Sequence, residues 1–167
     1  MSRVEDLREL TGEIQRYLDV STRLMAALGR LSEHDIPQMG KTTTTALAAA
    51  GLLENFYTAI ETVLFRISQN FGNSLDPERW HSDLLNKMTI SIPDTRPAVL
   101  SDQTRAMLDE LMRFRHFKRY YFQLEYDWHR LEYLMGLVGR LEPEVRSEFQ
   151  VFDRYLSALV SELTTDE

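Results

Sequence analysis

Apolar residues recur at helical spacing along most of the chain, and no other feature limits its fold as strongly. Near the N-terminus, apolar and small residues follow one another in alternating steps of three and four, which marks one face of an α-helix. These positions are Val4, Leu7, Thr11, Ile14, Leu18, Ser21, Met25 and Leu28. The spacing predicts a helix of about eight turns. The segment 34–40, which contains Pro37 and Gly40, is expected to end it.

Start and stop signals predict further helices. The threonines Thr42–Thr45 can cap a second helix, which Gly72 ends. Asp76 followed by Pro77 predicts the start of a short third helix that reaches roughly to Met88.

Ser101 and Asp102 open a fourth helix, and a last helical segment starts near Asp127. Three residues are expected to interrupt that segment: Gly136, Gly139 and Pro143. Apolar and polar residues never alternate long enough to predict a strand. The sequence therefore predicts an all-α, up-and-down helical bundle of five to six helices, forming a single domain over residues 1–167.

The charge balance is acidic, with 19 basic residues, 26 acidic residues and a net charge of −7. Such a surface repels nucleic acid on average, so any contact with RNA needs a local basic patch. The chain has no cysteine, which excludes disulfides, thiolate nucleophiles and cysteine-based metal sites. The longest apolar run, 46–53, is too short to cross a bilayer, and the charged segment 3–8 does not fit a secretory signal. We therefore expect a soluble, cytoplasmic protein.

A local basic patch lies in the segment 113–122, which reads RFRHFKRYYF. On a helix, Arg115, Lys118 and Arg119 share one edge, while His116 and Tyr120 are neighbours on another. Like charges this close destabilise a helix slightly, so another group must offset their repulsion.

Two readings of the basic patch follow. Carboxylates of the bundle, such as Glu110 and Glu125, neutralise it, or it binds an anionic ligand. We favour a phosphate-binding site, because the planar fork of arginine matches the geometry of a phosphate.

Four segments carry a resemblance to a known family. They are ENFYTAIETVLFRIS at 54–68, WHSDLLNKM at 80–88, IPDTRPAVLS at 92–101 and RFRHFKRYYF at 113–122. In order and separation they resemble the HEPN superfamily, and within it the HepT-like proteins, the toxin components of bacterial and archaeal toxin–antitoxin pairs. The resemblance implies a HEPN-type bundle and a homodimer.

The resemblance also implies a ribonuclease site. Its motif is an arginine, four to six further residues and a histidine, often with a tyrosine two positions beyond. Two copies meet in the dimer and cut RNA without metal. The arginine neutralises the scissile phosphate, and the histidine moves the proton of the 2′-hydroxyl, which suits a transesterification at phosphorus.

This chain departs from the motif at its histidine. If Arg115 is the motif arginine, Tyr120 takes the histidine position and Phe122 the tyrosine position. A phenol ordinarily has a pKa of about 10 against about 6.5 for an imidazole, so it is a poor base at neutral pH. We therefore expect weak or lost cleavage, with His116 beside Tyr120 as a substitute that acts from another angle. Three further residues are expected to bind RNA phosphates: Arg113, Lys118 and Arg119.

The antitoxins of this family are minimal nucleotidyltransferases that place AMP on the motif tyrosine, so the resemblance implies such a cognate partner. Phe122 has no hydroxyl to accept AMP, which leaves Tyr120 and Tyr121 as alternatives. The alternative function is a non-enzymatic helical module that docks the nucleotidyltransferase, with the basic patch serving the interface or the fold.

Two polar pairs elsewhere in the sequence are further candidate sites. Glu78 and His81 form half of a di-iron Glu-x-x-His signature, but the second half is missing, so we expect no metal, no cofactor and a structural role for His81. Tyr57 and Glu61 lie on the packed face of the second helix. We expect Glu61 at an ordinary core position, with pairing to the basic patch as the alternative.

Overall fold

The computed structural model describes residues 2–72, 74–121 and 125–165, except for the side chains of 118–121, and confirms the all-α bundle. Its helices, in chain order, are α1 (Arg3–Arg30), the π-helical turn η1 (Leu31–Asp35), α2 (Ile36–Met39), α3 (Thr43–Asn70), α4 (Trp80–Met88), α5 (Asp102–Tyr121) and α6 (Trp128–Thr165). The described residues contain no strand, only an isolated bridge between Ile92 and Arg96. None of the described helices is long and apolar enough to cross a membrane.

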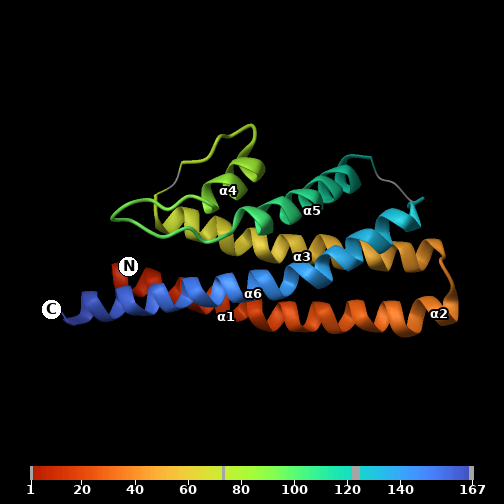
Figure 1. Ribbon diagram of the computed structural model, residues 1–167, viewed down its shortest axis with the longest axis horizontal. Coiled ribbons are helices and arrows are strands. Elements are labelled where there is room, and N and C mark those ends of the chain that lie inside the picture. Colours follow the sequence, from red (N-terminus) through yellow and green to blue (C-terminus); the bar gives the residue numbers. More distant parts are fainter. Residues whose placement is uncertain (1, 73, 122–124, 166–167) are drawn as a thin grey trace.

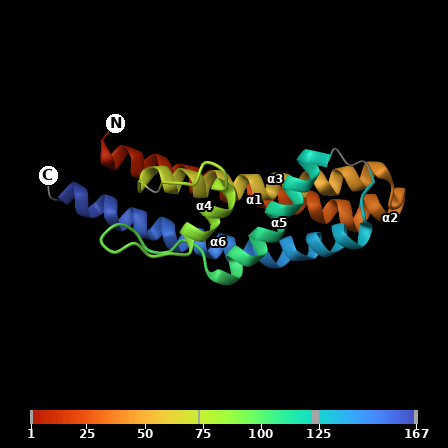
Figure 2. The ribbon, with the colours of Figure 1, turned by 90° about the horizontal axis from the view of Figure 1, so that it is seen from above.

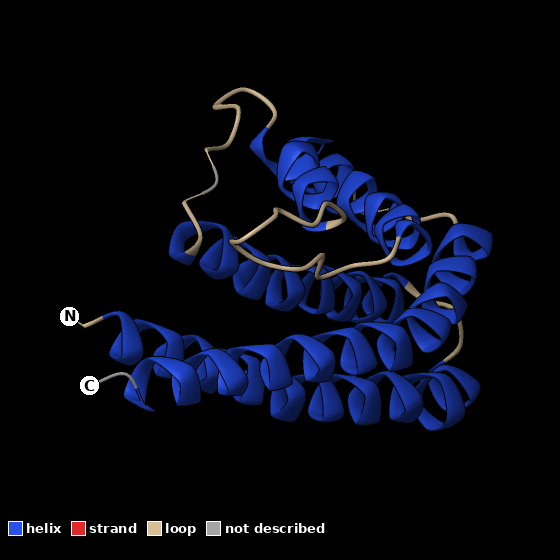
Figure 3. Ribbon diagram, turned by 60° about the vertical axis from the view of Figure 1, so that its left-hand side comes forward, coloured by secondary structure: helices blue, strands red, loops and turns tan. Residues whose placement is uncertain are grey.

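The long helices α1, α3 and α6 form the body of the bundle, and the two termini lie at the same end (Figure 1). The helices α4 and α5 cover the side of α3 that faces away from α1 (Figure 3). Seen from above, α5 runs obliquely across the long helices rather than along them (Figure 2). α3 is therefore the central helix, and its buried face carries large core residues such as Phe56, Tyr57 and Ile60.

The predicted end of the first helix is confirmed at Gly40 but not at Pro37. Helical structure continues from α1 through η1 and α2 to Met39, and Gly40 ends it with a positive φ of 82°. Pro37 does not break the chain because it lies in the first turn of α2, where a missing N–H costs no helical hydrogen bond.

The signals around α3 are confirmed, whereas the start of α4 was misplaced. Thr42 caps α3 through a reciprocal capping box with Thr45, and Gly72 follows its end with a φ of 69°. α4 begins at Trp80 rather than at Pro77. The reason is a local turn, in which Asp76 Oδ1 accepts the backbone N–H of Glu78 at 2.9 Å.

The predicted interruption of the last helix was also wrong. α6 is one helix of 38 residues with Pro143 inside it. Side chains on both sides of the proline hold the helix against α1. Val145 is fully buried, and Glu142 accepts hydrogen bonds from Arg146 at 2.7 Å and from Ser21 of α1 at 3.0 Å. Packing between helices therefore overrides the local preference of proline and glycine.

Candidate functional site

Arg115 is buried beneath the surface of the bundle rather than exposed on a cationic edge, with 6% of its surface accessible. One nitrogen of its guanidinium lies 3.0 Å from Oε1 and 3.2 Å from Oε2 of Glu61. The other nitrogen donates to the hydroxyl of Thr58 at 3.2 Å. The guanidinium also lies over the ring of Tyr57, 4.7 Å from its centroid. For Arg115, the prediction that a carboxylate inside the bundle neutralises the basic patch is confirmed. The carboxylate is that of Glu61 and not of Glu110 or Glu125.

Glu61 is the centre of this cluster and accepts from three helices. Oε2 accepts the hydroxyl of Tyr57 at 2.8 Å and contacts Nδ1 of His81 at 2.6 Å. Tyr57 comes from α3, His81 from α4 and Arg115 from α5. Glu61 is buried as expected, but it is not an ordinary core position, and the alternative pairing with the basic patch is confirmed. We call Tyr57, Glu61, His81 and Arg115 the Glu61 cluster.

The hydroxyl of Tyr57 acts as a donor within the Glu61 cluster. Burial, and after it the negative charge of Glu61, raises the pKa of the Tyr57 phenol above its ordinary value. The phenol therefore keeps its proton at neutral pH and donates it to the carboxylate.

Helical spacing and two aromatic contacts explain how the sequence builds the cluster. Tyr57 and Glu61 are four residues apart on α3, so they share a face. His81 is the second residue of α4, and its ring stacks on Trp80 with centroids 3.6 Å apart. Trp80 in turn packs against Phe65 of α3, at 5.6 Å. These contacts hold the start of α4 against α3.

Three members of the Glu61 cluster, Glu61, His81 and Arg115, line an open cleft of about 1120 Å³ between α3, the start of α4 and α5. This space matches the size of sites that hold small ligands or parts of larger ones. Its basic groups are Arg79, His81, Arg113, Arg115 and His116. Glu61 and Glu78 also line the cleft, so with neutral histidines its three arginines leave one net positive charge, in a protein whose overall charge is negative.

The remaining predicted site residues lie along α5. Arg113 lines the cleft with its side chain 72% exposed, and it pairs with Asp109 at 2.7 Å. His116 is exposed and lines the same cleft. Lys118, Arg119, Tyr120 and Tyr121 fall in the last part of α5, but their side chains lie outside the described residues, as does all of Phe122.

Sequence reasoning missed the place of His81. The sequence predicts a structural role for His81 and no metal with Glu78, but it does not indicate the partners of His81, which are Glu61 and Arg115. The available signal was the polar pair of Tyr57 and Glu61 within an apolar helix face, which requires a further partner when buried. Within the described ranges, no three His, Asp or Glu side chains are grouped to hold a metal ion.

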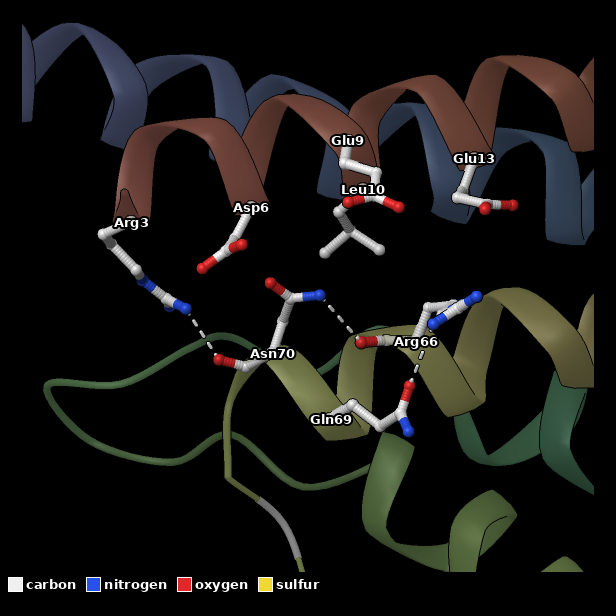
Figure 4. Close-up of a pocket in the computed structure, with 8 residues that line it drawn as sticks. All are labelled: Arg3, Asp6, Glu9, Leu10, Glu13, Arg66, Gln69 and Asn70. Atoms are coloured by element: carbon white, nitrogen blue, oxygen red, sulfur yellow. Dashed lines mark hydrogen bonds between the residues drawn. The ribbon is translucent and has the colours of Figure 1, made fainter. Parts of the chain in front are cut away.

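A second hollow, of about 310 Å³, lies between the start of α1 and the end of α3 (Figure 4). Its charges are mixed, with Asp6, Glu9 and Glu13 opposite Arg66. Arg3 donates to the backbone oxygen of Asn70 at 2.7 Å and so joins the two helices. This hollow has none of the predicted site residues.

Comparison with known proteins gives a family match. The family described as HepT-like protein matches residues 48–156. The matched span contains the whole Glu61 cluster and every basic residue of the cleft. No curated protein and no solved structure matches the chain.

Proposed function

Because the chain belongs to the HepT-like family of HEPN-type proteins, we propose that it acts in the cytoplasm as the toxin-like member of a toxin–antitoxin-type pair. In this role it binds RNA and has weak or lost metal-independent endoribonuclease activity. Its partner is a minimal nucleotidyltransferase.

The observation that carries the proposal is the place of Arg115 in the wall of a basic cleft. A phosphodiester in this cleft meets Arg113 at the surface and Arg115 deeper, and guanidinium groups bind phosphate oxygens in pairs. Lys118 and Arg119 continue the same segment toward the end of α5 and contribute further phosphate contacts.

Two features support weak or lost cleavage. Glu61 already takes up much of the positive charge of Arg115, at 3.0 Å, which lowers what the arginine offers to a developing phosphorane. Tyr120 stands at the motif position of the histidine, and a neutral phenol is a poor proton acceptor. In this proposal Arg115, Tyr120 and His116 remain the residues nearest the scissile phosphate.

Arg113→Ala is expected to weaken RNA binding several-fold without unfolding the protein, because Arg113 is exposed and its ion pair with Asp109 lies at the surface. The change is measured by fluorescence anisotropy with labelled single-stranded RNA at several salt concentrations. Loss of one phosphate contact lowers the slope of log K against log salt by about 0.7.

Arg23→Ala is the matched control for this measurement. Arg23 is an exposed arginine of α1, outside the cleft. It should bind RNA like the wild type. Equal loss of affinity in both variants shows that binding follows net charge alone and contradicts a site in the cleft.

One observation favours the alternative function, a non-enzymatic module that docks the nucleotidyltransferase. The pairing of Arg115 with Glu61 is what a basic patch that serves the fold requires. This alternative predicts no salt-dependent affinity for RNA, together with binding of the nucleotidyltransferase partner. The anisotropy measurement on the wild type therefore decides between the two functions.

The proposal includes a homodimer, since the resemblance implies that two copies of the motif meet. Light scattering on the protein as it elutes from a size-exclusion column is expected to give a molar mass near twice the 19.5 kDa of the single chain. A monomer at all concentrations up to those of the RNA-binding experiment contradicts a shared site.

A further inference from the structure

The geometry points to His81, oriented by Glu61, as the proton acceptor in the cleavage that this chain retains. The inference rests on the proposed function, because it assigns the base of the same RNA site. It replaces Tyr120 and His116 in that role with a residue from another helix.

His81 and Glu61 share one proton across a short contact. Nδ1 lies 2.6 Å from Oε2, a distance that two acceptors cannot share without a hydrogen. Nδ1 therefore donates to the carboxylate, and Nε2 is the ring nitrogen left as an acceptor. A carboxylate that fixes the tautomer of a histidine in this way is the arrangement of a general base.

Arg115 approaches the same ring nitrogen, with its Nη2 3.1 Å from Nδ1 of His81. With its hydrogen on Nδ1, His81 cannot accept from this nitrogen, so both groups donate to Glu61 instead. Within the described residues, Nδ1 makes all the polar contacts of His81 and Nε2 makes none. The free acceptor is thus a consequence of how the cluster satisfies its donors.

His81 is accessible from the cleft. Its side chain is 34% exposed and lines the cleft, whereas Glu61 and Arg115 are almost fully covered. Stacking on Trp80 at 3.6 Å fixes the plane of the imidazole. Arg79 and Arg113 line the same cleft, so a phosphodiester held there lies near both positive charge and a proton acceptor.

The reaction that this arrangement supports is a transesterification. Nε2 of His81 takes the proton of the 2′-hydroxyl while the 2′-oxygen forms a bond to phosphorus. The bond from phosphorus to the 5′-oxygen breaks, and the imidazolium returns the proton to that oxygen. The products are a 2′,3′-cyclic phosphate and a 5′-hydroxyl, with no further reactant.

The test compares cleavage of end-labelled RNA, under single-turnover conditions with EDTA present, by wild type, His81→Asn and His34→Asn. His34 is an exposed histidine of η1 outside the cleft and serves as the control. Asparagine keeps an N–H donor for Glu61 but lacks the acceptor at Nε2. His81→Asn is expected to lose roughly 10²- to 10⁴-fold in rate, with RNA affinity within about twofold of wild type. His34→Asn is expected to keep the wild-type rate and the cyclic phosphate product.

Each other result overturns the assignment. Wild-type cleavage by His81→Asn places the base elsewhere, and an equal loss in His34→Asn shows that the effect is not specific to His81. A wild type that binds RNA without any cleavage removes the inference but leaves RNA binding intact, whereas absence of binding removes the proposed function itself.

A second variant separates chemistry from folding. In His81→Ala, free imidazole is expected to restore part of the cleavage, because it supplies the missing acceptor. If both His81 variants unfold at a clearly lower urea concentration than the wild type, and imidazole restores no cleavage to His81→Ala, then His81 serves only the fold and the inference fails.

Discussion

Arg115→Met is expected to lower the free energy of unfolding by about 3–5 kcal/mol, because it leaves the buried carboxylate of Glu61 without its charged partner. Tyr57 and His81 would still donate to that carboxylate, but neither carries the permanent positive charge of a guanidinium. Methionine keeps much of the apolar volume of arginine, so the loss reports mainly the missing charge. Urea denaturation followed by circular dichroism measures it.

Two variants make this result specific. Arg113→Met removes an arginine of the same helix whose ion pair is exposed, and it is expected to cost less than about 1 kcal/mol. The double variant Arg115→Met with Glu61→Gln removes both charges and is expected to recover part of the loss. A single variant Arg115→Met as stable as Arg113→Met contradicts the burial of this pair.

Tyr120→His is expected to raise the rate of RNA cleavage by roughly 10²- to 10⁴-fold, the contribution of a general base. The prediction follows from the motif spacing, in which Tyr120 stands five positions after Arg115. A histidine there supplies a group that titrates near neutral pH. The measurement is cleavage of labelled RNA in EDTA, with analysis of the cyclic phosphate end.

Controls for Tyr120→His use the same position and the same cleft. Tyr120→Phe is expected to cleave no faster than wild type. Combining Tyr120→His with His81→Asn is expected to keep the gain, because the new histidine no longer depends on the Glu61 cluster. If Tyr120→His fails to exceed a wild type that already cleaves RNA efficiently, the inference of weakened cleavage is wrong.

The periodic pattern was enough to predict the helices, but not all of their ends. Spacing identifies which face of a helix is apolar, and Thr42 and Gly72 mark the limits of α3 through their own backbone and side-chain chemistry. Pro143 could not be placed correctly in the same way, because the residues that keep α6 intact belong partly to α1. Local signals fail where contacts between distant segments supply the stabilising energy.

The candidate site was predicted in part. Arg115 and Glu61 were both singled out, since an arginine-rich segment and a carboxylate on an apolar face are visible in one dimension. A helical wheel gives the angle of a side chain around its own axis, not which neighbouring helix it meets. The burial of Arg115 and the approach of His81 depend on the packing of α4 and α5 on α3, which the pattern does not specify.

The carboxylate of Glu61 both positions His81 and Arg115 for the proposed RNA chemistry and holds α4 and α5 against α3. Removing the carboxylate of Glu61 would free Arg115 to bind a phosphate. It would also remove the contacts that hold α4 and α5 on the central helix α3. Under the proposed function, faster RNA cleavage is therefore not expected from a change at residue 61 alone. Faster cleavage requires new stabilising contacts between these three helices, introduced before or together with the change in charge.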